Sequence, residues 1–421
     1  MTAGSMSVRY RRWFGLYLIF VAAISTVYGF LNTRRGSGWA IGEWLTNYSA
    51  GFIRRGLVGA VVLLLGHVSG IPLAWIAFGI QVVVYLIFLW CVYRLTEGLR
   101  WGWMVAAALL SPATLGFIVL DPPNGFKKEI LLFAALAAVI CLLLFDRLRD
   151  WQMAVLLSAL GIILVLSHEP LLFYLPYIFA AVAVHSGSTK RAVKVALWPA
   201  ILCSIAAVSV LLHPGDRAMA EKICSSVGGV LGTMEVHDAN VCGGALLWLE
   251  QPLAEAHRYV MAAVRLHHLF ALYGLLAVPT LLPAIAALVM LYRRDAARRE
   301  VKIIAVCSAI AFVSSLAVFY SGRDWGRWLQ MHAVCLMLLV LMVSRGERRG
   351  AQPKICLRGA RRWAAWAALA IYSTCWTLPA VDIYPARSGY YGLYRYLKDY
   401  GQTHGGENSN ADRPTQDAAP R

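Results

Sequence analysis

The sequence predicts an all-α, polytopic membrane protein, because apolar residues dominate it and recur in runs long enough to cross a bilayer. Of its 421 residues, 59% are hydrophobic and 14% are charged, whereas a typical soluble protein carries about 25% charged residues. The apolar runs are about 16 to 25 residues long, as a hydrocarbon core about 30 Å thick requires of a helix. A soluble globular domain is therefore excluded.

About eleven such runs predict about eleven transmembrane helices. The first, residues 13–31, follows the basic sequence RYRR, so the N-terminus is expected on the inner side. The others are expected at residues 72–93, 101–120, 129–145, 152–167, 170–186, 193–213, 266–292, 302–320, 327–344 and 363–380. We expect one transmembrane domain over residues 1–400, followed by a disordered polar tail at 401–421.

The basic residues indicate which loops lie on which side. The apolar part of residues 39–70 is short for a span, and if it does not cross, more than half of the 39 basic residues fall in short inner loops. Residues 32–71 are then an outer segment with interfacial helices, and residues 214–265 are a long outer loop. The net charge of +17 follows from this topology, so no nucleic-acid partner is expected.

The sequence NYSAGFIRRGLVG places two arginines on the predicted outer side, which the positive-inside bias disfavours. Gly51 and Gly56 flank Arg54 and Arg55 and permit close backbone approach. We interpret the arginines as phosphate ligands, and the alternative is an interfacial helix that binds anionic lipid headgroups. Glu43 lies on the same segment, about three turns earlier if the helix is continuous.

In LDPPNGFKKEILLF, a carboxylate ends one span and two lysines open the next. Asp121 precedes two prolines, and Lys127 and Lys128 stand where the helix macrodipole disfavours cations. An anion such as phosphate, bound by free N–H groups and both ammonium groups, would account for this placement. Lysines that snorkel to the membrane interface are the alternative.

The sequence LSHEPLLFYLPY interrupts a stretch that is too long for one span. It predicts a tight helical hairpin with His168 and Glu169 at its tip, and Pro170 suits the first turn of the second helix. A histidine beside a glutamate at a membrane boundary offers proton transfer near neutral pH. The alternative is a helix cap with a solvated histidine.

The long loop 214–265 contains two cysteines outside the apolar runs. Cys224 and Cys242 are candidates for a disulfide if the loop faces an oxidising compartment. The other cysteines lie in or beside apolar runs and are expected to be packed thiols. His237 and Asp238 in the same loop are too few ligands to indicate a metal site.

The sequence SGRDWGRWLQ lies between two predicted spans. If it continues as a helix, Arg323 and Arg327 share one face, with Asp324 one position round. Arginine suits bidentate phosphate binding, and Trp325 and Trp328 could stack on a sugar or anchor the helix at the interface. The alternative is a turn in which arginine and aspartate neutralise each other.

In layout and in these clusters, the chain resembles the C-type (GT-C) membrane glycosyltransferases and the related bacterial polysaccharide polymerases and ligases that use undecaprenyl-linked sugars. The resemblance is carried by GFIRRGLVG, NGFKKE, SHEP and GRDWGRW. It implies transfer of a sugar or oligosaccharide from a polyprenyl (di)phosphate to a saccharide hydroxyl at the extracytoplasmic face of the bacterial cytoplasmic membrane. Its partners would be the lipid-linked sugar, the bilayer and polysaccharide-assembly proteins.

Many of these enzymes bind a divalent metal with an acidic pair in the first outer segment, whereas here that segment has only Glu43. A metal-independent reaction without a cofactor is therefore expected, and a divalent ion is left open. The expected phosphate ligands are Arg54, Arg55, Lys127, Lys128, Arg323 and Arg327. The expected base is Glu169 or His168, with Asp324 and Asp121 orienting the cations or replacing the base.

Three other function classes compete with the glycosyltransferase. A flippase or transporter of lipid-linked sugars would need basic residues near the middle of its spans. An acyltransferase that modifies polysaccharide could use His168 and Glu169 but has less use for so many arginines. A structural assembly partner would not need the charged clusters.

Overall fold

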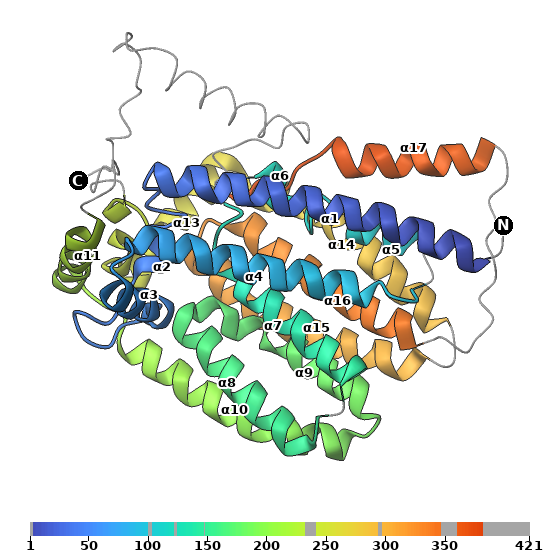
Figure 1. Ribbon diagram of the computed structural model, residues 1–421, viewed down its shortest axis with the longest axis horizontal. Helices are drawn as coiled ribbons and strands as arrows, with labels where there is room; N and C mark the ends of the chain where they lie inside the picture. The colour runs from blue at the N-terminus through green and yellow to red at the C-terminus, as the bar shows by residue number, and fades with distance from the viewer. Residues whose placement is uncertain are drawn as a thin grey trace, which may run out of the picture.

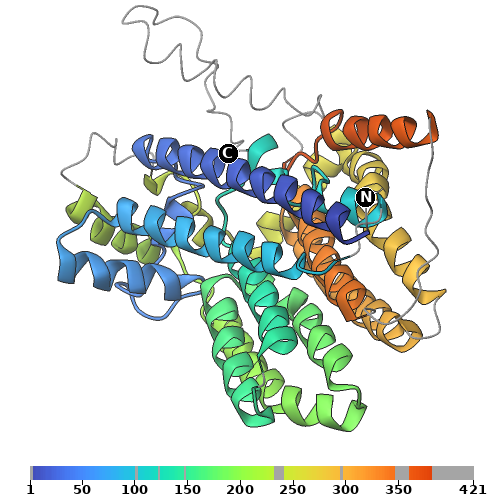
Figure 2. The same cartoon turned by 45° about the vertical axis from the view of Figure 1, so that its right-hand side comes forward.

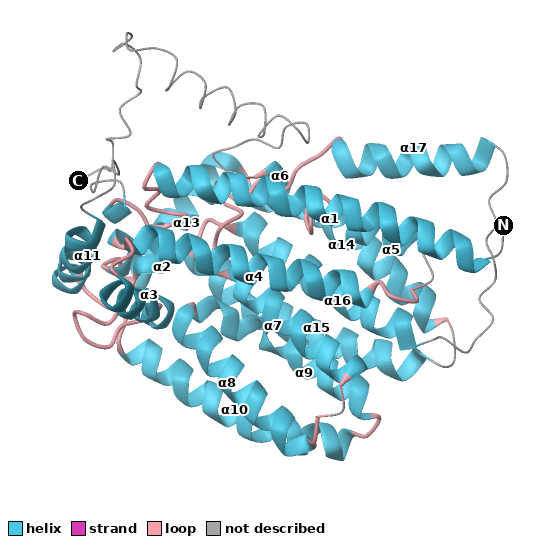
Figure 3. Ribbon diagram, viewed as in Figure 1, coloured by secondary structure: helices cyan, strands magenta, loops and turns pink. Residues whose placement is uncertain are grey.

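The computed structural model describes residues 3–99, 103–121, 124–146, 148–231, 241–293, 297–346 and 360–381. These residues form helices joined by turns, and no strand occurs among them (Figure 3). The all-α fold class is confirmed for this part of the chain. The predicted tail at 401–421 lies outside it.

Among the described residues, eight helices are long and apolar enough to cross a membrane. They are α1 (Ala3–Arg34), α4 (Leu73–Leu95), α8 (Asp150–Ser167), η1 with α9 (Glu169–Tyr174 and Leu175–Ser186), α10 (Thr189–Leu212), α14 (Leu269–Tyr292), α15 (Arg298–Ser321) and α16 (Trp325–Gly346). Two further apolar helices, α3 (Gly56–Ser69) and α7 (Glu129–Phe145), are shorter. The chain is therefore compatible with a multi-pass membrane protein.

The expectation of one continuous helix over residues 101–120 is wrong. The described part of this run forms α5 (Trp103–Leu109) and α6 (Phe117–Leu120), which are separated by a turn. Pro112 lacks an N–H group for a helical hydrogen bond, and the Thr114 hydroxyl donates to the Ala108 carbonyl at 2.8 Å. These local interactions replace the helical pattern that apolar composition alone predicts.

The last predicted span is also shorter than expected. Helix α17 (Ala360–Thr374) ends before residue 380. Pro379 disfavours a helical conformation at the residue before it, and residues 376–379 have no regular structure. The segment instead folds back, so that the Gly326 N–H donates to the Ala380 carbonyl at the start of α16.

The long helices lie side by side in a bundle, and most of them begin and end near one of its two ends (Figure 1). In Figure 2, residues 129–212 and residues 269–346 form two neighbouring groups, and α1 and α4 run across them. Helix α7 packs against α4, α9 and α16. We call the end that holds Asp121 and residues 124–129, 167–169 and 321–325 the junction end, and the opposite one the far end.

Helix α16 is the most enclosed of the long helices. Residues 325–343 are all buried, although Arg327, Gln330 and His332 are among them. Polar side chains inside a membrane bundle need protein partners, since lipid offers none. The partners of α16 therefore decide how its neighbours are placed.

The outer segment predicted at 32–71 folds as a one-turn helix, α2 (Gly42–Leu45), a turn, and α3. Glu43 is therefore not on a continuous helix with Arg54 and Arg55. The loop 214–265 contains α11 (Arg217–Leu231), η2 (Leu247–Leu249) and α13 (Leu253–His267). A small apolar cluster joins it to the outer segment, consisting of Ile53, Ile223, Leu246 and Leu249.

A disulfide joins Cys224 in α11 to Cys242, with a Cα–Cα distance of 5.8 Å. It ties α11 to the segment that leads to η2. Arg54 contacts η2, because its Nη2 donates to the Trp248 carbonyl at 3.1 Å. The loop 214–265 therefore covers part of the junction end.

The close approach of α3 to the end of α2 requires glycine at position 59. A Cβ atom there would collide with the carbonyl oxygen of Thr46, which is backbone and cannot turn aside. Gly59→Ala is expected to destabilise the protein by at least about 3 kcal/mol and to remove most of the monodisperse protein in size-exclusion chromatography after detergent extraction. Gly79→Ala in α4 is the control, since its Cβ would meet nothing within 4 Å. Equal recovery of the two variants would contradict the packing described.

Candidate functional site

The hairpin between α8 and η1 brings His168 into the interior of the junction end. The residue is extended, with φ of −163°, and only 2% of its surface is exposed. His168 is therefore the C-cap residue of α8, as the alternative expected, but it is buried and not solvated. Its Nδ1 lies 3.6 Å from Glu43 Oε1, and its Nε2 lies 3.5 Å from Glu129 Oε1.

Among the described residues, neither ring nitrogen of His168 has a hydrogen-bond partner. The imidazole thus stands between two buried carboxylates, each slightly too far for a hydrogen bond.

The carboxylate of Glu129 also forms a buried ion pair across the bundle. Arg327, in the first turn of α16, donates through Nη2 to Glu129 Oε1 and through Nη1 to Asp324 Oδ2, the latter at 2.7 Å. The side chains of Glu129 and Arg327 are each 5% exposed. This pair joins the N-terminus of α7 to the N-terminus of α16.

Sequence reasoning did not assign a role to Glu129. An acidic residue in the first turn of a helix is common, because the macrodipole favours it there, so its presence gave no signal. Its contacts with His168 and Arg327 follow from three-dimensional proximity alone.

Lys127 faces a carboxylate of the protein. Its Nζ lies 3.8 Å from Glu43 Oε2 and 4.9 Å from the centre of the Trp39 ring. Burial lowers the pKa of Lys127. Burial alone would raise the pKa of Glu43, but the neighbouring His168 and Lys127 hold it below its usual value. The anion beside this helix N-terminus is therefore Glu43.

Lys128 connects three segments. Its Nζ donates to the Arg55 carbonyl at 2.9 Å and to the Ser167 carbonyl at 3.0 Å. The residue is fully buried, and burial lowers its pKa to about 8. Its contacts are those of a structural support for Arg55 and for the hairpin tip.

Arg54 and Arg55 share the carboxylate of Glu169. Arg55 donates through Nε and Nη2 at 2.6 to 2.9 Å, and Arg54 Nη1 lies 3.7 Å away. These three side chains are 21 to 22% exposed, in contrast to the interior of the cluster. They form the accessible rim of the site.

Arg323 and Arg327 do not share a helix face, because α15 ends at Ser321 and α16 begins at Trp325. Arg323 instead lies over the Tyr259 ring of α13, 4.6 Å from its centre. The continuous helix on which a shared face would depend is therefore absent at this point of the chain. Gly322, whose backbone is extended, separates the two helices.

The two tryptophans of this stretch are buried. Trp325 packs edge-on against Phe270 and Phe319 and donates its indole N–H to the Phe319 carbonyl. Trp328 is 5% exposed. The half-exposed aromatic ring beside the charged residues is that of Trp39, next to Lys127.

Asp121 lies at the C-terminus of α6 and binds the returning segment near residue 380. Its carboxylate accepts from Asn124 Nδ2 at 2.9 Å and from the Ala380 N–H at 3.0 Å. Burial raises the pKa of Asp121. A carboxyl group with a raised pKa is better matched to proton transfer near neutral pH than an ordinary one.

We call these residues the charged cluster. Among the described residues it comprises five cations, Arg54, Arg55, Lys127, Lys128 and Arg327, which face the carboxylates of Glu43, Glu129, Glu169 and Asp324 around His168. The charges nearly balance, which reduces the cost of burying them. In the same part of the chain, no group of three or more metal-ligating side chains is found.

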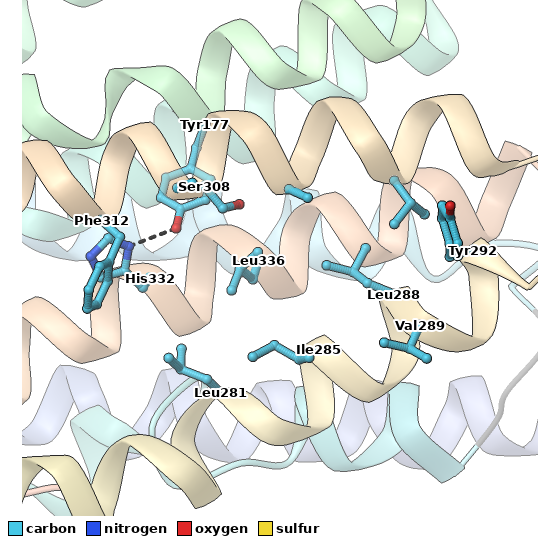
Figure 4. A pocket seen from close by; sticks show the side chains of 13 residues that line it. Tyr177, Leu281, Ile285, Leu288, Val289, Tyr292, Ser308, Phe312, His332 and Leu336 are labelled. Atoms are coloured by element: carbon cyan, nitrogen blue, oxygen red, sulfur yellow. Dashed lines mark hydrogen bonds between the residues drawn. The ribbon is translucent and has the colours of Figure 1, made fainter.

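An apolar pocket of about 420 Å³ that opens to the surface of the bundle is lined by α14, α15, α16 and Tyr177 of α9 (Figure 4). At one end, the Tyr177 hydroxyl hydrogen-bonds with His332 Nδ1 at 2.7 Å, and Ser315 Oγ hydrogen-bonds with His332 Nε2 at 3.0 Å. These bonds join α16 to α9 and α15. They fix α16 about one and a half turns from Arg327.

Comparisons with protein-family models, with curated protein sequences and with solved structures found no match to this chain. The functional interpretation therefore depends on the geometry of the charged cluster.

The ion pair between Glu129 and Arg327 gives a stability prediction. Glu129→Gln leaves the Arg327 guanidinium buried without its main counter-charge, so a loss of about 3–5 kcal/mol is expected. The double variant Glu129→Gln/Arg327→Met buries no such charge and is expected to be more stable than Glu129→Gln alone. Thermal unfolding in detergent measures both. Asp150→Asn, which breaks an exposed pair with Arg191 at the far end, is the control and should change little.

Lys128 gives a prediction about pH. Because its pKa is about 8 in the folded protein and 10.5 for an ordinary lysine, the folded state binds fewer protons between these values. Its contribution to stability therefore increases as pH rises through this interval. The unfolding temperature of the native protein, relative to that of Lys128→Met, is expected to increase between about pH 7.5 and about pH 9.5. A difference that stays constant or decreases would contradict the burial of this amine.

Proposed function

We propose that the protein transfers a sugar or oligosaccharide from a polyprenyl (di)phosphate donor to a saccharide hydroxyl. The observation that carries the proposal is the meeting of Arg54, Arg55, Glu169 and His168 at one end of an apolar helical bundle. Cations suited to a phosphate lie beside groups suited to accept a proton, where a lipid-anchored substrate would present both its headgroup and its sugar.

We further propose that the junction end is extracytoplasmic. The disulfide-bearing loop 214–265 contacts Arg54, and disulfides form in oxidising compartments. Among the described residues, Arg293, Arg298 and Arg345 lie at helix ends of the far end, as the positive-inside bias favours for the cytoplasm. In this topology the N-terminus is cytoplasmic, about eleven segments span a bacterial cytoplasmic membrane, and residues 32–71 lie on its outer face.

The reaction is a single displacement at the anomeric carbon. The acceptor oxygen forms the new bond, and the bond between the sugar and the phosphate breaks with its electron pair left on the phosphate. Arg54 and Arg55 stabilise the negative charge of the leaving group. Glu169 accepts the proton of the acceptor hydroxyl. The preceding residue, His168, lies between Glu43 and Glu129.

The buried residues of the charged cluster hold the other residues of the site in place. Arg327 and Glu129 fix α16 against α7, and Lys128 holds the Arg55 backbone. Trp39, half-exposed beside Lys127, offers a sugar ring an aromatic face. The reaction then needs no metal ion, because arginines neutralise the leaving group.

A proton-coupled flippase or transporter of lipid-linked sugars is the second candidate. The burial of His168 between two carboxylates favours it, since such groups form proton relays within membranes. Against it, Arg54, Arg55 and Glu169 are partly exposed and lie at the end of the bundle, not at the middle of a span.

Transfer is testable with the purified protein in lipid bilayers. With a lipid-linked oligosaccharide as donor and acceptor, mass spectrometry should detect products with a new glycosidic bond. Arg55→Gln is expected to reduce the rate at least about 100-fold, because a donor to the leaving group is lost. Arg191→Gln, at the far end, is the matched control and should retain activity.

Two outcomes would contradict the proposal. Full activity in both His168→Ala and Glu169→Gln would exclude these residues as the base. Movement of the lipid-linked sugar across the bilayer without a new glycosidic bond would favour the transporter.

A further inference from the structure

Glu169 occupies the position between Arg54 and Arg55 in which an anionic ligand would bind. We propose that Glu169 is a counter-ion that a ligand must displace from the two arginines in order to bind. A diphosphate binds strongly enough to displace it, and a singly charged anion does not. This inference rests on the proposed function, because it concerns the group by which the donor is held.

The contacts of the carboxylate are those that a phosphate would make. Both oxygens of Glu169 accept from Arg55, Oε1 from Nε and Nη2 and Oε2 from Nε, and Arg54 approaches Oε1 from the other side. Arginine forks bind carboxylate and phosphate with the same planar geometry. A ligand phosphate and Glu169 therefore compete for the same donors.

Contacts other than those with Glu169 hold the Arg55 backbone and the Arg54 side chain. Arg55 has a left-handed backbone, with φ of 67°, a conformation that residues other than glycine rarely adopt. Its carbonyl is fixed by Lys128, and the next residue, Gly56, lies so close to the Tyr48 ring that no side chain fits. Arg54 donates through Nη2 to the Trp248 carbonyl. The Arg55 backbone and the Arg54 guanidinium thus keep these contacts when the carboxylate leaves.

Glu169 is also the glutamate of the charged cluster that can move. Its side chain is 21% exposed, whereas those of Glu43 and Glu129 are 4 to 5% exposed. It begins η1, directly after the extended residue His168. Displaced from the arginines, the carboxylate becomes available to accept the proton of the acceptor hydroxyl.

The charge of a ligand determines whether it can displace Glu169. Two guanidinium groups and one carboxylate leave one positive charge at the rim. A singly charged anion brings the arginines the same charge as the Glu169 carboxylate that it displaces, so the exchange gains little binding free energy. A diphosphate brings at least two negative charges and satisfies both arginines, which offsets the loss of the Glu169 contacts.

Isothermal titration calorimetry on the full-length protein in lipid nanodiscs tests this inference with two inert probes, pyrophosphate and dimethyl phosphate. The native protein is expected to bind pyrophosphate measurably and dimethyl phosphate not at all. Glu169→Gln removes the competitor and should bind pyrophosphate at least about tenfold more tightly, because charge-assisted hydrogen bonds no longer have to be broken. Glu221→Gln, which breaks an exposed pair with Arg217 in α11, is the control and should bind as the native protein does.

Glu169→Asp keeps the negative charge and is the control for an effect of folding alone. Its affinity for pyrophosphate should lie closer to that of the native protein than to that of Glu169→Gln. Unchanged or weaker pyrophosphate binding in Glu169→Gln would overturn the inference, as would an absence of binding in both proteins. If that happens while glycosyl transfer still depends on Arg55, the inference fails and the proposed function stands. If binding tightens as expected but no transfer is found, the proposed function fails instead.

Discussion

The ion pair between Glu129 and Arg327 is the interaction on which the other features of the charged cluster depend. It joins α7 to α16, whose residues 325–343 are all buried, and both side chains of the pair are almost completely buried. Charges in such a place need close partners of opposite sign. The pair therefore fixes where the N-termini of both helices meet, and Lys127, Lys128 and His168 take their positions from it.

The charged cluster has an interior and a rim with different properties. In the interior, opposite charges are paired and Lys128 donates to two backbone carbonyls, so these groups organise the junction end but offer little to a ligand. At the rim, two arginines share one partly exposed carboxylate, and other contacts hold the Arg54 side chain and the Arg55 backbone. An anionic ligand would therefore bind at the rim, and its affinity would depend on how easily Glu169 leaves.

The sequence predicted the helices and the charged segments well, because apolar length and charge are local properties. Their partners could not be predicted, since Glu129 was inconspicuous in its own helix and acquires its role from α16, about 200 residues away in the chain. The break near Pro112 was missed because apolar composition hides it, whereas the break between α15 and α16 was predicted from the charged residues between two apolar runs. The burial of Trp325 depends on Phe270 and Phe319, which sequence patterns could not bring together.

The most direct test of the account is a cryo-electron microscopy structure of the protein in lipid with a polyprenyl diphosphate bound. The account predicts phosphate oxygens within about 4 Å of the guanidinium groups of both Arg54 and Arg55, with the Glu169 carboxylate turned away and the Glu129–Arg327 pair intact. A diphosphate bound at the far end, beside Asp150 and Arg191, would contradict it. So would a bound diphosphate with the contacts between Glu169 and the arginines unbroken.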